Sequence, residues 1–393
     1  MPGPLDGIRI IDVTQMISGP VATMLLGDQG ADVIKIEPPG TGDFVRSYGG
    51  KRAGLPPMFA TTNRNKRSVV LNLKDPRGLA LLKRLVETAD VFVQNFRPGT
   101  AERMGMGEAA IRAVRSDIIY VSISGFGESG PYADQPAYDP VIQALSGLAS
   151  IQSDETGRPR LVRTIVPDKV TGLSAAQAIT AALLARARTG TGQHVRLAML
   201  DVMVSFLWPE GMARYTWVDT EDDDTRPART RDLIFATQDG FITCSAMSDT
   251  DWRGLTRALG HPEWLDDPRF SSVARRERFA DDRLTRTAEV LRTRTSAEWL
   301  RRLRAEGVPC APVLHREDLL TDPQIAANEL IVESEHPHAG HMRQARPAAR
   351  FEQTPADIRR PAPLLGEHTD EVLHELGLDG AEIADLRRAK VVE

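Results

Sequence analysis

The first 125 residues alternate between short apolar runs and stretches with helical spacing, and this alternation constrains the fold more than any other feature. Strands are predicted at 8–13, 32–37, 68–73, 91–96 and 118–124, and helices at 20–29, 76–89 and 108–115. Strands separated by a helix form parallel βαβ crossovers. The pattern therefore predicts a doubly wound α/β domain.

The loop after the first predicted strand indicates which ligand such a domain accepts. It reads TQMISG over 14–19 and lacks the glycines of G-x-G-x-x-G, which allow close approach to a pyrophosphate. Glu37 stands where a ribose-binding acid would lie, but without the glycine loop we do not expect NAD or FAD. Ligands of these sheets bind beyond the carboxyl ends of strands, where Asn95 and Phe96 are placed.

Four basic residues, Arg64, Lys66, Arg67 and Lys74, flank the predicted strand at 68–73. They have two interpretations. Scattered basic residues usually form a solvated strand end, whereas Lys and Arg gathered at the mouth of a strand can clamp a phosphate.

The stretch from Arg160 to Asp201 predicts a loop, a long helix and a strand, with Asp168 at the start of the helix. Asp is a favoured N-cap, because its carboxylate accepts from backbone N–H groups that have no helical partner. The same position offers a second interpretation, in which the helix dipole keeps Asp168 ionised and nucleophilic. The local sequence favours the N-cap interpretation but does not exclude the nucleophile.

The second half of the chain changes character after a charged linker at 221–231 (EDDDTRPARTR), where we place a domain boundary. A hairpin is predicted over 233–245, followed by Arg-rich helices without an acid, His or Cys cluster. We interpret this α+β region as a scaffold or lid. From 324 the chain is predicted to be irregular until helices at 369–376 and 381–390.

Composition excludes several classes of protein. A chain of 393 residues suggests two domains, and a net charge of −5 gives no reason to expect nucleic acid or an anionic membrane as partner. No apolar run approaches a membrane span, and the first residues do not resemble a signal peptide, so we expect the cytoplasm.

The cysteines and a histidine-rich segment suggest no metal site. Cys244 and Cys310 are far apart in the sequence and indicate neither a disulfide framework nor zinc. His336, His338 and His341 could bind zinc, but Pro337 and Gly340 break any helix that would align them. We expect a solvated turn there.

Taken together, several segments resemble the class III CoA-transferases, the family of formyl-CoA:oxalate CoA-transferase, carnitine CoA-transferase and α-methylacyl-CoA racemase. They are PLDGIRIIDVTQMISGP, GADVIKIEPPGTGD, NKRSVVLNLKDPRG, NFRPGTAERMG, ISGFGESGPYA, PDKVTGLSAAQAITAALLARARTGTGQHVRLAMLD, GVPCAPV and PLLGEHTDEVLHELGL. Their order and spacing cover essentially the whole chain.

The resemblance implies a Rossmann-like large domain (1–220, completed by the return segment 326–393), a small α+β domain with its linker (221–325), and an interlocked, ring-like homodimer. It implies that Asp168 attacks an acyl-CoA thioester and carries CoA to a free carboxylic acid through acyl–aspartyl anhydride and aspartyl-CoA intermediates. Coenzyme A is then a substrate, and no permanently bound cofactor is expected.

The resemblance also assigns binding residues one by one. Positions matching the family's CoA contacts are Met16, Leu73, Lys74, Asn95, Phe96 and Arg103, and Asp139 matches an acidic residue near the active site. Three positions depart from the oxalate enzyme: Ile17 replaces Gln, Pro38 replaces Arg and Pro136 replaces Lys. These departures and the missing glycine-run loop argue against oxalate as the acceptor.

Two other functions stay open. The racemase branch needs a second base, but Tyr138 stands where that branch has His, and a Tyr with a pKa of about 10 is a poor base at neutral pH. A non-catalytic acyl-CoA-binding protein is the other alternative, against which the retained Asp168 argues. Arg46, Arg160 and Arg163 are candidates for binding a second carboxylate, as a dicarboxylic substrate would need.

Overall fold

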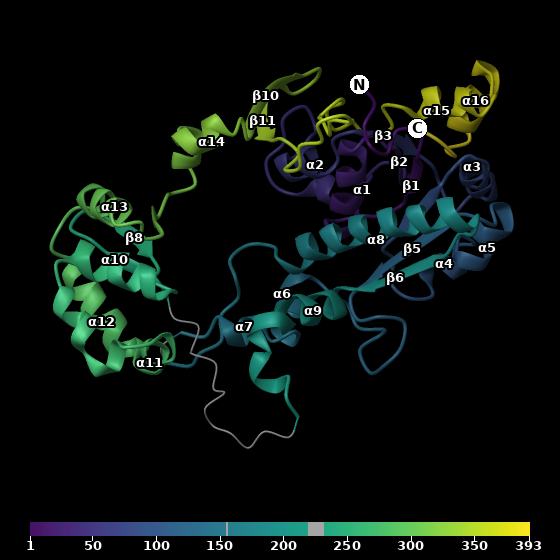
Figure 1. Cartoon of the computed structure of the whole chain (residues 1–393). Helices are drawn as coiled ribbons and strands as arrows, with labels where there is room; N and C mark the ends of the chain where they lie inside the picture. The colour runs from purple at the N-terminus through teal and green to yellow at the C-terminus, as the bar shows by residue number, and fades with distance from the viewer. Residues whose placement is uncertain (155, 219–231) are drawn as a thin grey trace. The chain divides into compact units, whose positions relative to one another are not determined.

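The computed structural model describes residues 1–154, 156–218 and 232–393, and the chain divides into two compact units (Figure 1). The large unit comprises Met1–Met212 and Glu329–Glu393, and the small unit comprises Ala213–Asn328. The linker predicted over 221–231 lies outside the described residues.

The large unit is built on a six-stranded parallel sheet in the order β3-β2-β1-β4-β5-β6. Its strands are β1 (Arg9–Asp12), β2 (Asp32–Glu37), β3 (Lys66–Val70), β4 (Val91–Gln94), β5 (Ile119–Ser124) and β6 (His194–Ala198). The predicted α/β sheet is confirmed. The progression of strands reverses between β1 and β4, and doubly wound sheets of this order bind ligands at that point.

Helices cover both faces of this sheet. On one face lie α1 (Ser18–Asp28) and the long α8 (Pro167–Thr189), and on the other lie α3 (Pro76–Glu87), α5 (Glu108–Val114), α15 (Thr369–Glu375) and α16 (Gly380–Arg388). Length and composition alone would let α8 cross a membrane. It packs instead on α1, β5 and β6, where Ala175 and Ile179 are fully buried, as in the core helix of a globular domain.

The large unit contains further helical elements. They are α2 (Pro57–Thr62), α4 (Thr100–Arg103), α6 (Asp139–Leu145), α7 (Leu148–Ile151), α9 (Met199–Gly211), and the 3-10 turn η1 (Phe44–Ser47). Of these, α6 and α9 lie beside α8 and position the site described below.

The return segment contains a hairpin that the sequence pattern missed. Strands β10 (Ile331–His336) and β11 (Gly340–Ala345) pair antiparallel where an irregular tail was predicted. The histidine-rich segment is the hairpin turn, but His336 is buried and its Nε2 lies 2.8 Å from the Ala362 carbonyl oxygen. The expectation of a solvated turn is therefore wrong for His336. Among the described residues, no cluster of three or more His, Cys, Asp or Glu is arranged to hold a metal ion.

The small unit has an antiparallel sheet of β7 (Ile234–Ala236), β8 (Phe241–Cys244) and β9 (Cys310–Pro312). Its helices are α10 (Asp249–Leu259), α11 (Val273–Arg278), α12 (Ala280–Leu291), α13 (Ser296–Ala305) and α14 (Pro323–Ala327), with 3-10 turns η2 (Ala213–Tyr215), η4 (Pro262–Asp266), η5 (Pro268–Phe270) and η6 (Asp318–Leu320). The core gathers Trp252, Trp264 and Trp299. Cys244 and Cys310, distant in the sequence, face each other across β8 and β9 as free thiols.

Candidate active site

The start of α8 does not use Asp168 as its cap. The N-cap position is Val166, Pro167 is the first helical residue, and Asp168 is the second. The Asp168 backbone N–H donates to Oδ2 of Asp139, 3.3 Å away on α6. The N-cap interpretation is therefore wrong, because Asp168 lies within the first turn of α8 and its side chain makes no capping hydrogen bond.

Helix α6 also holds the segment that leads into α8. Gln143 Nε2 donates to Oδ1 of Asp139 at 2.6 Å, and Gln143 Oε1 accepts from the Val162 N–H at 2.9 Å. The same Nε2 lies 3.3 Å from the carbonyl oxygens of Val162 and Thr164. Both polar side chains are buried, with Asp139 7% and Gln143 2% exposed. One helix thus fixes both the approach to α8 and its first turn.

The opposite side of Asp168 faces the first turn of α1. The backbone N–H and the hydroxyl of Ser18 face the Asp168 carboxylate and favour its ionised form. The two helices approach closely at Gly172, where a Cβ atom would lie 2.9 Å from the Ser18 carbonyl oxygen. A side chain at Gly172 would push α8 away from α1, so glycine permits the contact of Ser18 with Asp168.

Burial raises the pKa of Asp168 to about 6, and the nearby charge of Asp139 adds to this rise, whereas the N–H and hydroxyl of Ser18 lower the pKa. From the sequence, the helix dipole is expected to keep Asp168 ionised. In the structure, burial and a like charge outweigh these stabilising contacts. Roughly nine-tenths of the carboxylate is still ionised at pH 7, so it can act as a nucleophile.

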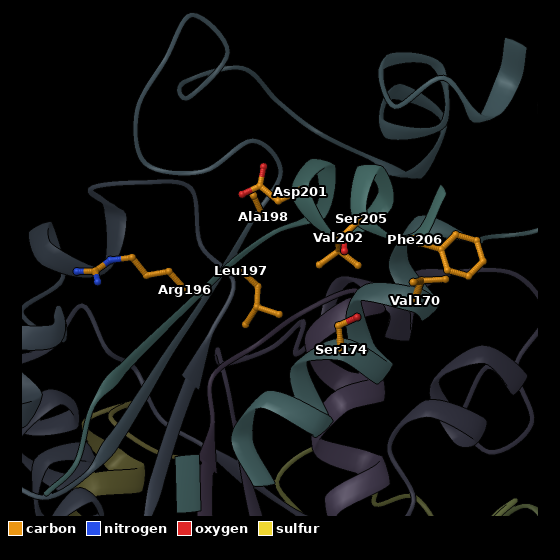
Figure 2. A pocket seen from close by; sticks show the side chains of 9 residues that line it. All are labelled: Val170, Ser174, Arg196, Leu197, Ala198, Asp201, Val202, Ser205 and Phe206. Atoms are coloured by element: carbon orange, nitrogen blue, oxygen red, sulfur yellow. The ribbon is translucent and has the colours of Figure 1, made fainter. Parts of the chain in front are cut away.

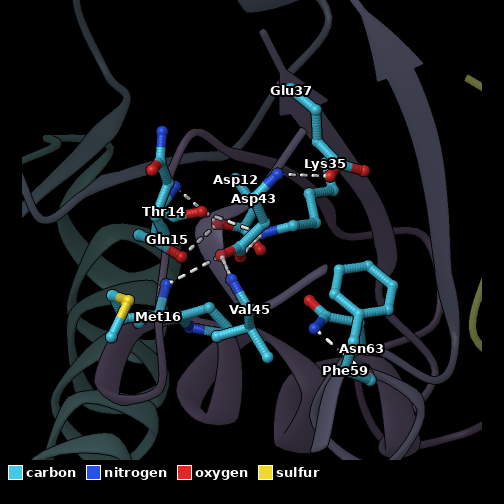
Figure 3. Close-up of polar contacts among 12 residues, drawn as sticks. Asp12, Thr14, Gln15, Met16, Lys35, Glu37, Asp43, Val45, Phe59 and Asn63 are labelled. Carbon is cyan, nitrogen blue, oxygen red and sulfur yellow. Dashed lines mark hydrogen bonds and ion pairs between the residues drawn. The ribbon is translucent and has the colours of Figure 1, made fainter. Parts of the chain in front are cut away.

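The loop between β1 and α1 is held by side chains from three directions (Figure 3). Lys35 Nζ donates to the Thr14 carbonyl oxygen at 2.8 Å, and Asp43 accepts from the Met16 N–H at 3.0 Å. Lys35 and Asp43 form a fully buried ion pair of 2.9 Å. These contacts hold Met16 at φ 69°, a left-handed conformation unfavourable for a side chain with a Cβ.

Asn95 holds the same loop from the third side. Its Oδ1 accepts from the Gln15 N–H at 2.9 Å and its Nδ2 donates to the Gln15 carbonyl oxygen at 2.7 Å. This pair joins the loops after β1 and β4, where the strand order reverses. The Asn95 amide is therefore engaged in shaping the loop that carries Met16.

A second buried ion pair lies beneath this loop. Lys66 Nζ is 3.0 Å from Oδ2 of Asp12, and the hydroxyls of Thr14 and Thr23 donate to the same carboxylate at 2.5 and 2.7 Å. Burial would raise the pKa of Asp12, but the charges of Lys66 and Lys35 and the two hydroxyls lower it well below its usual range. This carboxylate is a structural anion.

Most of the predicted phosphate clamp is internal to the fold. Lys66 is fully buried on Asp12, Arg64 pairs with Asp28 at 2.8 Å, and Arg67 pairs with Asp32 at 2.6 Å. Both sequence interpretations are wrong for these three residues, because their charges are neutralised by carboxylates rather than by water or phosphate. Only Lys74, after β3, is exposed as predicted.

The predicted CoA-contact residues all follow the carboxyl ends of strands or the loops next to them. Leu73 and Lys74 follow β3, Met16 follows β1, and Asn95 and Phe96 follow β4. Arg103 ends α4, is exposed, and donates to Thr100 Oγ1 at 2.8 Å. The exposed cations Lys74 and Arg103 are available to anions.

Two hollows lie near these strand ends. One of about 410 Å³ is lined by Val170 and Ser174 of α8 together with β6 and α9 (Figure 2). A larger one of about 990 Å³ is lined by Phe96 and by residues at the carboxyl ends of β4, β5 and β6. Asp168 lines neither hollow, although Val170 in the smaller one lies two residues after it.

The three arginines predicted as candidates for a second carboxylate differ in whether their guanidinium groups are free to bind it. Arg46 is buried and bonded to both carboxylate oxygens of Glu37 at 2.7 Å, so it cannot bind a substrate without breaking that pair. Arg160 pairs with Asp154 at 2.7 Å. Arg163 is exposed and has no hydrogen bond or ion pair to the rest of the described chain.

Sequence reasoning missed Ser18, Gln143 and Asp43. Gln143 lies four residues after Asp139, and this helical spacing could have suggested their contact. Ser18 and Asp43 carry no local signal, because each meets its partner only through tertiary packing.

The chain is similar to known proteins over nearly its whole length. The sequence model of CoA-transferase family III matches residues 5–369. The chain is 34% identical to succinyl-CoA:glutarate CoA-transferase from Homo sapiens, over 99% of this chain and 90% of that protein. It is also 34% identical to formyl-CoA:oxalate CoA-transferase from Streptomyces avermitilis, over 99% of both. The crystal structure of Rv3272 from M. tuberculosis superposes with a TM-score of 0.82 at 31% identity, covering 94% of this chain and 98% of that one.

Proposed function

The chain belongs to CoA-transferase family III, and we propose that it moves CoA from an acyl-CoA thioester to a free carboxylic acid with Asp168 as the nucleophile. The observation that carries this proposal is the Asp168 carboxylate itself. It is half-buried, faces Ser18 and Asp139, and forms no ion pair among the described residues. A carboxylate without a cation keeps its electron pair available for attack.

The proposed reaction runs in two symmetric halves. An Asp168 oxygen attacks the thioester carbonyl carbon, the C–S bond breaks, and CoA thiolate leaves an acyl–aspartyl anhydride. The thiolate then attacks the aspartyl carbonyl carbon, the donor acid leaves as its carboxylate, and aspartyl-CoA remains. The acceptor carboxylate reverses these steps and leaves as its CoA thioester, which regenerates Asp168.

The first turn of α8 suggests an oxyanion donor for these steps. Pro167 has no N–H, and the Asp168 N–H donates to Asp139. The Lys169 N–H has no acceptor within the described part of the chain, so it is the free donor of this turn. Backbone donors aimed at developing negative charge lower the barrier to acyl transfer.

Replacing the nucleophile tests the proposal. Asp168→Ala is expected to lower the transfer rate by at least about 10³-fold while the protein stays folded, since the variant lacks the carboxylate on which the anhydride forms. Incubation with acyl-CoA and hydroxylamine should modify Asp168 in the unaltered protein, as read by peptide mass. An Asp168→Ala variant that keeps most of its activity would refute the assignment.

We also propose that the acid partner is a dicarboxylate whose second carboxylate binds Arg163. The human relative is named for succinyl-CoA and glutarate, which both carry a second carboxylate. Arg163 is exposed, lies five residues before Asp168, and its backbone neighbours Val162 and Thr164 contact Gln143. A guanidinium suits this task because it binds a carboxylate with two parallel hydrogen bonds.

Arg163→Ala should raise KM for a dicarboxylic acceptor about tenfold and leave a monocarboxylic acceptor of equal length nearly unchanged. Arg160→Ala is the matched control, since this exposed arginine is three residues away and paired with Asp154. Equal effects of Arg163→Ala on both acceptors would exclude the proposed recognition.

A homodimer, interlocked as in the family that the sequence resembles, completes the proposal. Large apolar side chains of α8 and α9 are exposed: Leu173 58%, Leu184 53%, Phe206 57% and Trp208 44%. Exposed apolar side chains gathered on neighbouring helices are typical of an interface. Light scattering after size exclusion should give twice the mass of one chain.

The free thiols of Cys244 and Cys310 fit the proposed cytoplasmic location.

A further inference from the structure

Helix α6 makes an unusual set of contacts beside the proposed nucleophile. Its two buried polar side chains, Asp139 and Gln143, bond each other and reach no other part of the described chain than the segment from Val162 to Asp168. A buried amide and a buried carboxylate are costly to place in a fold without partners. Here both side chains form hydrogen bonds with backbone groups around the start of α8.

We propose that Asp139 and Gln143 form a latch that positions Asp168 for attack, with Asp139 anchoring the first turn of α8 and Gln143 anchoring the segment that precedes it. The inference rests on the proposed function of Asp168. Both are positioning residues, since they contact backbone groups and not the reacting atoms.

The geometry explains why a latch is required at this point. The N-cap residue Val166 offers no side-chain oxygen, and Pro167 contributes no N–H. The start of α8 therefore lacks the local cap that normally fixes a helix end. The contact from Asp139 to the Asp168 N–H replaces that cap from outside the helix. Without it, the residue that must attack would sit on a fraying turn.

Gln143 holds the other half of the latch. Its amide bonds the backbone N–H and carbonyl oxygen of Val162 and the carbonyl oxygen of Thr164, while its Nε2 also fixes Asp139. The latch is thus one connected network, so loss of Gln143 should loosen both Asp139 and the approach segment.

Asp139 has a second effect, through its charge. Asp168 faces Asp139 from α6 and the uncharged Ser18 from α1, and the adjacent Lys169 directs its amine to Thr164 Oγ1 at 3.1 Å. Asp139 is therefore the charged group that acts on Asp168. Positioning and charge can be separated at the Asp168 N–H, because Asn keeps one oxygen to accept it, gives up the oxygen that accepts from Gln143 and removes the charge, whereas Ala removes both oxygens and the charge.

The test compares Asp139→Asn, Asp139→Ala and Gln143→Leu with Ile142→Val, a matched change at a buried neighbour on α6. The readouts are kcat/KM against pH, KM for acyl-CoA, the single-turnover rate of Asp168 modification by acyl-CoA, and thermal unfolding. We expect Gln143→Leu and Asp139→Ala to slow modification about 10- to 100-fold with little change in KM. Asp139→Asn should stay within about fivefold at pH 7, and both Asp139 variants should move the acid limb of kcat/KM to lower pH.

Equal rates for Asp139→Asn and Asp139→Ala would overturn the latch, as would losses that follow the unfolding temperature alone. If Gln143→Leu does not fold, the pair of Asp139 variants still decides. Asp168→Ala, measured in parallel, separates the two proposals: if it stays active, the nucleophile and the latch both fail, whereas if it is inactive and the latch variants match Ile142→Val, only the latch fails.

Discussion

Two carboxylates of the large unit, the buried Asp12 at the end of β1 and the half-buried Asp168 in the first turn of α8, have opposite surroundings. Asp12 accepts from Lys66 and from the hydroxyls of Thr14 and Thr23, and these partners lower its pKa. Asp168 has Ser18 as donor and a second carboxylate, Asp139, as neighbour, and its pKa is raised to about 6.

The difference separates a structural acid from a reactive one. A carboxylate bound by a buried ammonium group is a poor nucleophile, because its charge is already neutralised and its lone pairs are occupied. A buried carboxylate without a cation is costly to the fold, but its charge stays available for reaction. The fold carries this free-energy cost at Asp168, whereas at Asp12 the ammonium group of Lys66 offsets it.

The largest effect on stability is expected at Lys66. Lys66→Met leaves the Asp12 charge buried with fewer partners, and removing one member of a buried pair destabilises by about 3–5 kcal/mol. Urea unfolding at pH 7 measures the loss. The double variant Asp12→Asn with Lys66→Met should recover much of it, and a Lys66→Met protein of unaltered stability would contradict the assigned ion pair.

Asp168→Asn should act in the opposite direction, although it abolishes transfer. Removing a charge that the fold disfavours should raise the free energy of unfolding at pH 7 by about 1 kcal/mol. The sign follows from the raised pKa: the native state binds the proton more tightly, so the cost of ionisation is present above pH 6 and disappears below pH 4. The stability difference from the unaltered protein should therefore vanish in acid, and a difference independent of pH would show that charge is not its cause.

The smallest effect on stability is expected at Lys74, which lies eight residues after Lys66 but is exposed. Lys74→Ala should leave the unfolding free energy within about 0.5 kcal/mol of the unaltered value. If it contacts a CoA phosphate as predicted, KM for acyl-CoA should rise about three- to tenfold at low salt and less at high salt. No change in KM at low salt would remove Lys74 from the CoA site.

The sequence predicted the α/β sheet, the position of Asp168 near the start of a helix, and the family, because period-two and period-3.6 patterns and ordered motifs are local properties of a chain. It predicted poorly wherever a residue's role depends on a partner distant in sequence. Lys66 and Arg67 were assigned to a strand mouth, but β3 begins at Lys66, so their charges meet Asp12 and Asp32 inside the fold. Cys244 and Cys310, separated by 65 positions, became direct neighbours for the same reason.

Asp168 shows most clearly which properties the sequence determines and which the tertiary structure decides. Sequence alone determined that a carboxylate stands at the start of a long apolar helix, and its local surroundings favoured an N-cap. Tertiary structure decided that Asp139 accepts the backbone N–H instead, and that Ser18 and Asp139 face the carboxylate from two other helices. The physical reason is that a cap and a pKa depend on which groups lie within a few ångströms, and those groups come here from α6 and α1, some 30 and 150 residues earlier in the chain.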